Sequence, residues 1–373
     1  MIIVSSIQSQ RVERDAKIAE LHERLTAAVE ELVSGDAWMK ALEFSARFRR
    51  RSFNNVLLIH AQHAAAFELG TVPEPAPTYV AGFKQWQTLG RRVTTGQHGY
   101  AILAPVTARF ATSEPTDPSS WRRLASIERP RAGEVVRPKL IGVRPAYVWD
   151  VSQTDGRPLP ARPAPKLLRG EAPIGLWDAL AALVDRSGFT LSTAPDAAAL
   201  GGANGLTNFA NRTVHVRADL EPAAGVKTLA HELAHIRLHD PVAAPQSAEP
   251  LATAIPTDPD EVPQHRGIAE VEAESVALMV GAAHGMDTSV FTVPYVSGWA
   301  SSVPEMSLVE VLQTTGERVR RAAGGILDEL RTPQLDDGDP VALEQMHATA
   351  ARAPAPTAPP TRPADRISTR GLA

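Results

Sequence analysis

Apolar residues recur at helical spacing from the start of the chain. Between residues 10 and 33 most of them fall three or four positions apart, with charged residues between them and Gly35 just beyond. The sequence therefore predicts an amphipathic helix within a first segment of residues 1–35. A second helical stretch, from about Trp38 to His63, directs a set of apolar side chains toward a core: Phe44, Phe48, Val56 and Ile59.

Shorter segments separated by Gly and Pro follow these helices. The pattern predicts a short helix at 78–89, strands at 91–94, 100–106 and 139–149, and an extended hairpin loop at 111–138. Beyond a linker at 161–173, it predicts a helix at 176–187, strands at 189–192 and 213–216, and helices at 226–239 and 266–284. We expect an α+β protein, with N-terminal helices and a small antiparallel sheet in residues 36–160 and a second domain in residues 174–331.

Composition adds three expectations. The stretch 332–373 is rich in Pro and Ala and poor in aromatic residues, which is typical of a disordered tail. The chain has no cysteine, so any metal site must use His, Asp or Glu. Neither a signal peptide nor a run of about eighteen apolar residues is present, and we therefore expect a cytoplasmic protein with no membrane partner.

The net charge of −4 conceals a basic region. Residues 37–110 contain nine basic and three acidic residues, a net charge of +6. Basic side chains could neutralise phosphates, and aromatic rings could stack on unpaired bases. The candidate DNA contacts are Arg47, Arg49, Arg50, Arg51, Asn55, Lys84, Trp86, Arg91 and Arg92. The alternative is that the aromatic residues belong to the core and the arginines form a solvated face.

The motif HELAH, in the run TLAHELAHIRLH, is the strongest chemical signal. His231 and His235 are four residues apart, so on a helix they point from one face and can bind one ion. Glu232 lies beside them as a candidate catalytic base, because a carboxylate next to a catalytic Zn2+ can take a proton from water. The alternative is an amphipathic helix that matches this short pattern by chance.

A third ligand must come from elsewhere. The predicted helix IAEVEAESVALMV offers Glu270 as the first choice, because small residues on that face allow close approach, and Glu274 as the alternative. His239 could support a ligand, lie at the edge of the core or act as a charge at the helix end. Tyr295 could polarise an intermediate or serve packing only. Such a site would hydrolyse a peptide bond, with the strand at 213–216 available to pair with an extended substrate.

Two stretches resemble a known family. SFNNVLLIHAQ, TYVAGFKQWQTLGRRVTTGQHGYAILAPV and VWDVSQTDGRPLP resemble the N-terminal, single-stranded-DNA-binding domain of ArdC-like antirestriction proteins. The segment around HELAH, with GIAEVEAESVALMV and VPYVSGWA, is similar to the zincin-type domain of that family, which is related to ImmA/IrrE-like metallopeptidases. The resemblance implies zinc held by His231, His235 and Glu270. Residues at characteristic positions of the first stretch are Asn55, Gln62, Gly82, Trp86, Gly90, Arg91, Val93, Gly96 and Gly99.

Three functional hypotheses remain open from the sequence. The first is an antirestriction-type protein of mobile elements that binds single-stranded DNA. The second is a regulatory metallopeptidase that cleaves a protein partner. The third is a catalytically silent domain with structural zinc. The sequence does not indicate an oligomeric state.

Overall fold

The computed structural model describes residues 2–159, 170–242, 262–287, 306–335 and 338. It begins with three helices, α1 (Ile2–Glu30), α2 (Gly35–Arg47) and α3 (Phe53–Glu68), and a 3-10 turn η1 (Glu31–Val33) follows α1. The expectation of one continuous helical stretch across 38–63 was wrong. Phe48 leaves the helical conformation, and the Ser52 side chain accepts a hydrogen bond from the Asn55 N–H to begin α3. The predicted core face is confirmed: Phe44, Phe48, Val56 and Ile59 are buried in one cluster.

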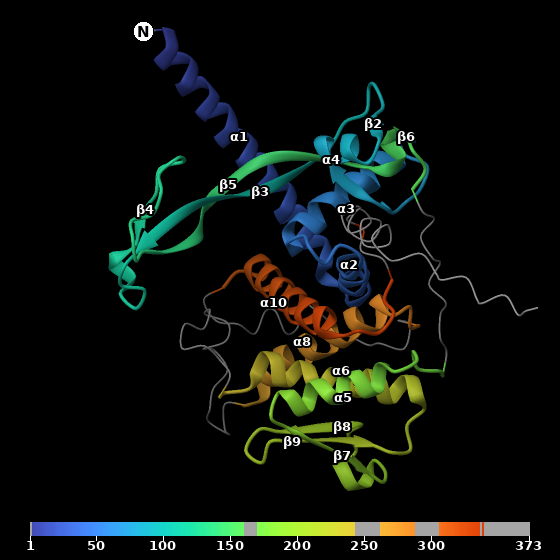
Figure 1. The fold of residues 1–373 in the computed structure, drawn as a ribbon. Helices are drawn as coiled ribbons and strands as arrows, with labels where there is room; N and C mark the ends of the chain where they lie inside the picture. Colours follow the sequence, from blue (N-terminus) through green and yellow to red (C-terminus); the bar gives the residue numbers. More distant parts are fainter. Residues whose placement is uncertain (1, 160–169, 243–261, 288–305, 336–337, 339–373) are drawn as a thin grey trace, which may run out of the picture.

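The N-terminal sheet is antiparallel, as expected. It contains β1 (Val80–Gly82), β5 (Val135–Asp150), β3 (Tyr100–Thr112) and β4 (Arg122–Arg123), in the order β1-β5-β3-β4. Between β1 and β3 lie helix α4 (Phe83–Thr88) and strand β2 (Arg91–Val93), which pairs with β6 (Thr154–Gly156). Strands β3 and β5 are longer than predicted, so part of the expected loop is strand. Together they form a two-stranded hairpin that projects from the N-terminal helices (Figure 1).

Two amides dock helix α3 against the first half of β3, on the edge where β4 pairs only with Phe110 and Ala111. Asn55 donates to the Leu103 carbonyl and accepts from the Leu103 N–H, both at 2.9 Å. Gln62 makes the same pair of bonds with Ala101, again at 2.9 Å. Each side chain thereby satisfies the backbone groups that a neighbouring strand would otherwise occupy.

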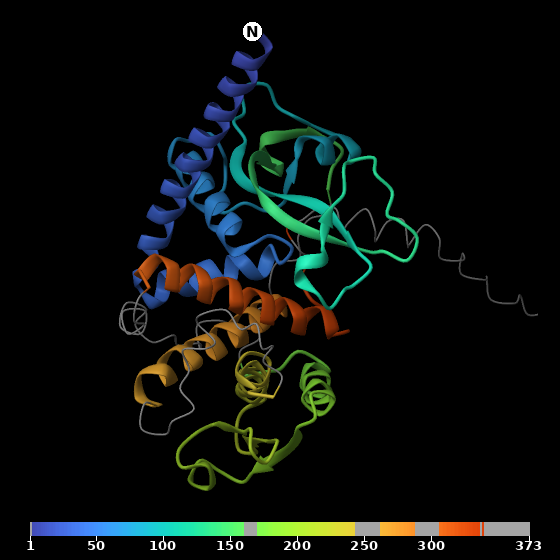
Figure 2. The same cartoon turned by 90° about the vertical axis from the view of Figure 1, so that its left-hand side faces the viewer.

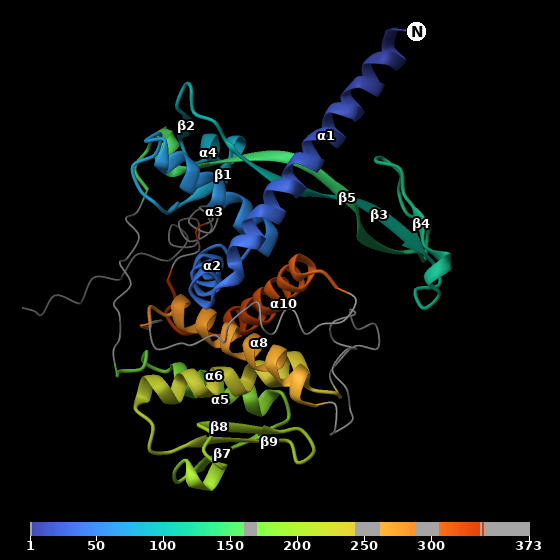
Figure 3. The same cartoon turned by 180° about the vertical axis from the view of Figure 1, so that it is seen from behind.

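The C-terminal part is a layered arrangement of one sheet and several helices. Its elements are α5 (Leu176–Arg186), β7 (Thr190–Ala194), β8 (Gly205–Asn208), β9 (Thr213–Arg217), α6 (Pro222–His239), α8 (Val262–Ala283) and α10 (Leu308–Glu329). The sheet has the order β7-β9-β8, with β7 parallel and β8 antiparallel to β9. Helices α5 and α6 cover the sheet, and α8 and α10 lie above them (Figures 1 and 3).

Helix α10 and strand β8 were not predicted from the sequence. Helix α10 begins with a capping box in which the side chains of Ser307 and Glu310 satisfy each other's backbone N–H groups. It lies between the N-terminal helices and α8, as the side view also shows (Figure 2).

One hydrophobic cluster extends through both halves of the chain. It contains side chains of α1, α2 and α3 together with those of α5, α6, α8 and α10. At the joint, the Trp38 indole N–H donates to the Ser275 hydroxyl at 2.9 Å, with both residues fully buried. The proposed domain boundaries stay predictions, and most of the linker lies outside the described residues.

The C-terminal end of the described chain packs against the body. The Leu335 N–H donates to the Ala283 carbonyl at 2.7 Å, and Gly338 accepts from the Val80 N–H at 3.0 Å. Of the predicted tail, residues 336–337 and 339–373 lie outside the described residues. No helix in the described ranges is long and apolar enough to cross a membrane.

Candidate functional sites

Helix α6 fixes the two histidines of the HELAH motif. Pro222 occupies the first turn, where a missing N–H costs nothing, and the helix buries Val226, Leu229 and Leu233 in the core. The histidines lie on the adjoining face, toward α8. The sequence prediction of this helix and of its two-histidine face is confirmed by the structure.

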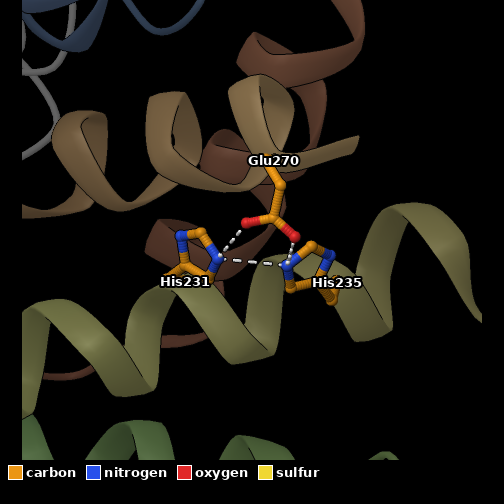
Figure 4. A group of neighbouring side chains, drawn as sticks. All are labelled: His231, His235 and Glu270. Atoms are coloured by element: carbon orange, nitrogen blue, oxygen red, sulfur yellow. Dashed lines mark hydrogen bonds and ion pairs between the residues drawn. The ribbon is translucent and has the colours of Figure 1, made fainter. Parts of the chain in front are cut away.

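His231, His235 and Glu270 meet at one point (Figure 4). Their two Nε2 atoms are 3.0 Å apart. The Glu270 carboxylate, from α8, lies 3.3 Å from Nε2 of His231 and 3.6 Å from Nε2 of His235. Bonds of about 2.0–2.1 Å around a tetrahedral zinc place neighbouring ligand atoms about 3.3 Å apart. The three side chains therefore already have the spacing that one such ion requires.

The protonation of the histidines is consistent with a cation site. Burial disfavours the charged form of His231, but hydrogen bonds to Glu270 and Glu274 outweigh it and raise its pKa to about 9. Burial, with His231 and His239 nearby, lowers the pKa of His235. Two carboxylates, one on each nitrogen of the ring, therefore stabilise a positive charge on His231, whereas its neighbour His235 has a lowered pKa.

Glu274 contacts the other side of the His231 ring. Its Oε2 lies 3.3 Å from Nδ1 of His231, and its Oε1 lies 2.6 Å from Nζ of Lys227. A carboxylate on Nδ1 keeps the proton there and leaves the Nε2 lone pair free for a metal. Of the two candidate carboxylates, Glu270 therefore lies with the Nε2 atoms and Glu274 lies behind the ring.

Glu232 is buried beside the two histidines against strand β8. Its Oε2 accepts a hydrogen bond of 2.6 Å from the Thr207 hydroxyl. Burial raises the pKa of this carboxyl, so its affinity for a proton is greater than that of an exposed glutamate. A Cβ atom on Gly205 would lie 2.5 Å from Oε1 of Glu232, so the close approach of strand and carboxylate depends on that glycine.

A pocket of about 910 Å³ opens over this group. Its lining includes Gly205, Leu206 and Thr207 of β8, as well as the three grouped side chains and Glu232. The expectation that the strand at 213–216 pairs with substrate was wrong, because β9 lies between β7 and β8 and both of its edges are occupied. Strand β8 is at the edge of this sheet, and its residues line the pocket.

His235 has a further partner behind it. Its Nδ1 lies 3.1 Å from Nδ1 of His239, whose Nε2 lies 2.9 Å from Oε2 of Glu272. Glu272 is fully buried and accepts from the Arg318 guanidinium at 2.6 Å. His239 is therefore a buried side chain between His235 and Glu272, not an exposed charge at the helix end.

Several predicted DNA contacts are occupied within the protein. Trp86 is fully buried, and its indole N–H donates to the Trp149 carbonyl at 3.0 Å, so its ring offers no stacking face. Asn55 is held by Leu103, as described above. Arg91 donates to both the hydroxyl and the carbonyl of Thr154 at 2.8 Å, which locks β2 to β6.

The remaining basic candidates divide into two groups. Arg51 donates to the Val80 carbonyl at 2.6 Å, and Arg49 donates to the side chain of Gln334. The exposed candidates are Arg47, Arg50, Lys84 and Arg92. Tyr295 lies outside the described residues.

The sequence patterns did not indicate the residues that surround His231, His235 and Glu270. Thr207 and Gly205 lie on the unpredicted strand β8, and Arg318 lies on the unpredicted helix α10. The Ser307–Glu310 capping box was a usable signal for α10. No pattern in the sequence indicated that Arg318 reaches Glu272.

Comparisons with known proteins agree with the N-terminal resemblance. The family described as the N-terminal domain of anti-restriction factor ArdC matches residues 15–137, about a third of the chain. No curated protein matches the chain.

Two solved structures of the antirestriction ArdC protein from the R388 plasmid are similar. The metal-free structure has 18% identity and a TM-score of 0.46, covering 83% of this chain and 96% of that chain. The Mn(II)-bound structure has 17% identity and a TM-score of 0.44, covering 83% and 97%. The family match therefore shows that residues 15–137 carry a domain of the ArdC N-terminal type.

Proposed function

We propose that the C-terminal part of this protein is a zinc-dependent peptidase. The observation that carries the proposal is the group of two Nε2 atoms and one carboxylate at 3.0–3.6 Å, with Glu232 beside it in a pocket. Two histidines, one carboxylate and an open position form the ligand set of a catalytic zinc site. We assign His231, His235 and Glu270 as the ligands.

The chain's own residues have distinct roles in this reaction. When bound, the ion supplies Lewis acidity, which polarises a carbonyl and acidifies water. Glu232 accepts the proton of the attacking water and passes it to the leaving amine. The Thr207 hydroxyl holds the Glu232 carboxylate toward the pocket through its 2.6 Å hydrogen bond. An extended peptide pairs with the edge of β8 that has no neighbouring strand in the described sheet, which brings the peptide backbone past His231, His235 and Glu270.

Substitution of the base separates chemistry from binding. Glu232→Gln keeps the shape of the side chain and the acceptor for Thr207 but cannot take a proton. Zinc-loaded wild type and variant are each incubated with a proteome-derived peptide library, and new termini are identified by mass spectrometry. We expect cleavage by wild type only and equal zinc content in both proteins. Equal cleavage by the variant, or no cleavage by either, contradicts the proposal.

The metal is tested by the same assay. Imidazole ligands suit zinc, whereas carboxylates also suit Mn2+, and a similar solved protein is described with Mn(II). Metal-free protein is therefore loaded with zinc or Mn2+ in parallel. We expect higher affinity and cleavage with zinc. If zinc binds and stabilises the fold but no peptide is cut, the structural-zinc hypothesis replaces this proposal.

We also propose that the N-terminal domain binds single-stranded DNA as part of an antirestriction function. A specific surface favours it: one face of the β3–β5 hairpin carries the exposed residues Arg137, Lys139 and Arg144. The Lys139 ammonium lies 5.8 Å from the centre of the Phe110 ring, and the Arg137 guanidinium lies 5.3 Å from that of Trp121. Neither cation has a carboxylate partner in the described part of the chain. Free cations beside aromatic rings suit a phosphate backbone with unpaired bases.

The hairpin surface is tested by the salt dependence of binding. Arg137→Ala/Lys139→Ala removes two charges, and the control Arg186→Ala/Arg237→Ala removes two charges from the C-terminal half. Each phosphate contact on a single strand contributes about 0.7 to the slope of log affinity against log salt, so the hairpin variant should lose about 1.4. The probe is a labelled oligonucleotide, single-stranded or duplex. A slope equal to that of wild type and control contradicts the assignment, as does a preference for the duplex.

A further inference from the structure

A series of hydrogen bonds runs from the proposed metal site into the interior, through His235, His239, Glu272 and Arg318 in that order. Glu272 is fully buried, and the exposed fraction of the Arg318 side chain is 11%. Arg318 donates to both oxygens of the Glu272 carboxylate, from Nε to Oε1 at 2.6 Å and from a terminal guanidinium nitrogen to Oε2 at 3.2 Å. Oε2 also lies 2.9 Å from Nε2 of His239. A carboxylate buried to this extent requires such partners, because an isolated buried charge is strongly unfavourable.

The chemistry of the end groups fixes the direction of the hydrogen bonds. A guanidinium only donates and an ionised carboxylate only accepts, so Nε2 of His239 must carry the proton. The tautomer of His239 with its proton on Nε2 has its lone pair on Nδ1, which accepts from Nδ1–H of His235 across 3.1 Å. The remaining nitrogen of His235, Nε2, keeps its lone pair, and this is the atom beside Glu270.

Helix α10 supplies Arg318 and also contacts the N-terminal helices. The Glu317 carboxylate accepts from the Phe53 N–H at 2.9 Å, at the start of α3. Arg320 donates to the Arg49 carbonyl at 2.8 Å. The part of α10 that carries Arg318 is therefore held by α8 on one side and by the N-terminal helices on the other.

We infer that Glu272 and Arg318 are positioning residues for the metal centre, acting through His239 on the tautomer and orientation of His235. This inference rests on the proposed metal site. A hydrogen-bond acceptor behind a histidine ligand contributes about 10–100-fold to metal affinity. The same contribution is expected here although neither residue touches the ion.

A pair of double variants separates this role from a purely structural ion pair. Glu272→Gln/Arg318→Met removes both charges but keeps an amide oxygen that can accept from His239. Glu272→Leu/Arg318→Met removes the same charges and the acceptor as well. A structural ion pair is lost equally in both, whereas the positioning role is lost only in the second.

Zinc affinity is measured by competition with a chromophoric chelator, using the full-length chain at fixed pH. We expect the Kd of the Gln/Met variant to stay within about threefold of wild type and that of the Leu/Met variant to rise about 10–100-fold. Melting of the metal-free proteins establishes that both are folded. Equal affinities of the two variants overturn the inference. Failure of wild type to bind zinc instead overturns the proposed function.

A single variant covers the case in which the Leu/Met protein does not fold. His239→Leu leaves the Glu272–Arg318 pair intact and removes the acceptor for His235 Nδ1–H. It should raise the Kd for zinc by the same 10–100-fold factor. An affinity equal to wild type overturns the inference.

Discussion

Substitution of one glycine in α10 tests how tightly the two halves of the chain are joined. Gly316 is buried where α10 meets α3. A Cβ atom added there would lie between 2.3 and 2.7 Å from three carbon atoms of the Phe53 ring. Phe53 is itself fully buried and begins α3, so the ring has no open space to move into. Gly316→Ala must therefore shift one helix relative to the other.

The control lies in the same helix. A Cβ atom on Gly325, which is exposed, meets nothing within 4 Å. Glycine to alanine inside a helix is stabilising by about 1 kcal/mol through helix propensity, and this gain applies to both variants. Overpacking a well-packed contact costs about 1–3 kcal/mol. Subtracting one variant from the other cancels the propensity gain and leaves the cost of the contact at Gly316.

Denaturant unfolding at constant temperature measures this difference. We expect Gly325→Ala to unfold at a higher denaturant concentration than wild type. The free energy of unfolding of Gly316→Ala should be about 1–3 kcal/mol below that of Gly325→Ala. Equal stability of the two variants would refute the close packing of α10 on α3.

Two further predictions concern the N-terminal helix α3 and the metal group. Asn55→Ala should lower the free energy of unfolding by about 1–3 kcal/mol, because it leaves both backbone groups of Leu103 unpaired. The control is Asn54→Ala, which removes a buried Oδ1 that has no hydrogen-bond partner among the described residues, so stability should be unchanged or higher. Equal losses in the two variants would contradict the docking role of Asn55. Zinc affinity should rise about tenfold per pH unit between pH 6 and 8 and level off near the pKa of His231, about 9, because the ion displaces a proton there. The folding stability of the metal-free protein changes in the opposite direction with pH. Protonated His231 contributes its full stabilisation below its unfolded pKa of about 6.5, and this stabilisation is lost as pH rises through about 9. An affinity independent of pH in competition titrations would contradict the assignment of His231.

Local pattern predicted the helices well but not their ends or their partners. Apolar spacing located α1, α5 and α6, because each buries one stripe of its own side chains. It did not reveal the break at Phe48–Ser52, since apolar residues continue in phase on both sides of it. The signal was the Ser52 cap, which a periodicity analysis does not weigh.

The site was predictable only as far as residues close in sequence determine it. The four-residue spacing of His231 and His235 fixed two candidate ligands, but Glu270 and Glu274 share a face of α8 and spacing alone could not separate them. Arg91 and Trp86 were predicted as DNA contacts, yet the structure uses them to join β2 to β6 and to fill a core. A charged or aromatic residue in a sequence motif can serve the fold as readily as a ligand, and only tertiary contacts distinguish the two.

Metal stoichiometry is the most direct measurement of the central claim. Protein stripped with chelator, reloaded with zinc and desalted is analysed by inductively coupled plasma mass spectrometry, together with Glu270→Ala and Glu274→Ala. The account predicts one zinc ion per chain for wild type and less than about a tenth of an ion per chain for Glu270→Ala. Glu274→Ala should also hold one ion per chain, but with lower affinity. No zinc in wild type, or a full complement in Glu270→Ala with none in Glu274→Ala, would contradict it.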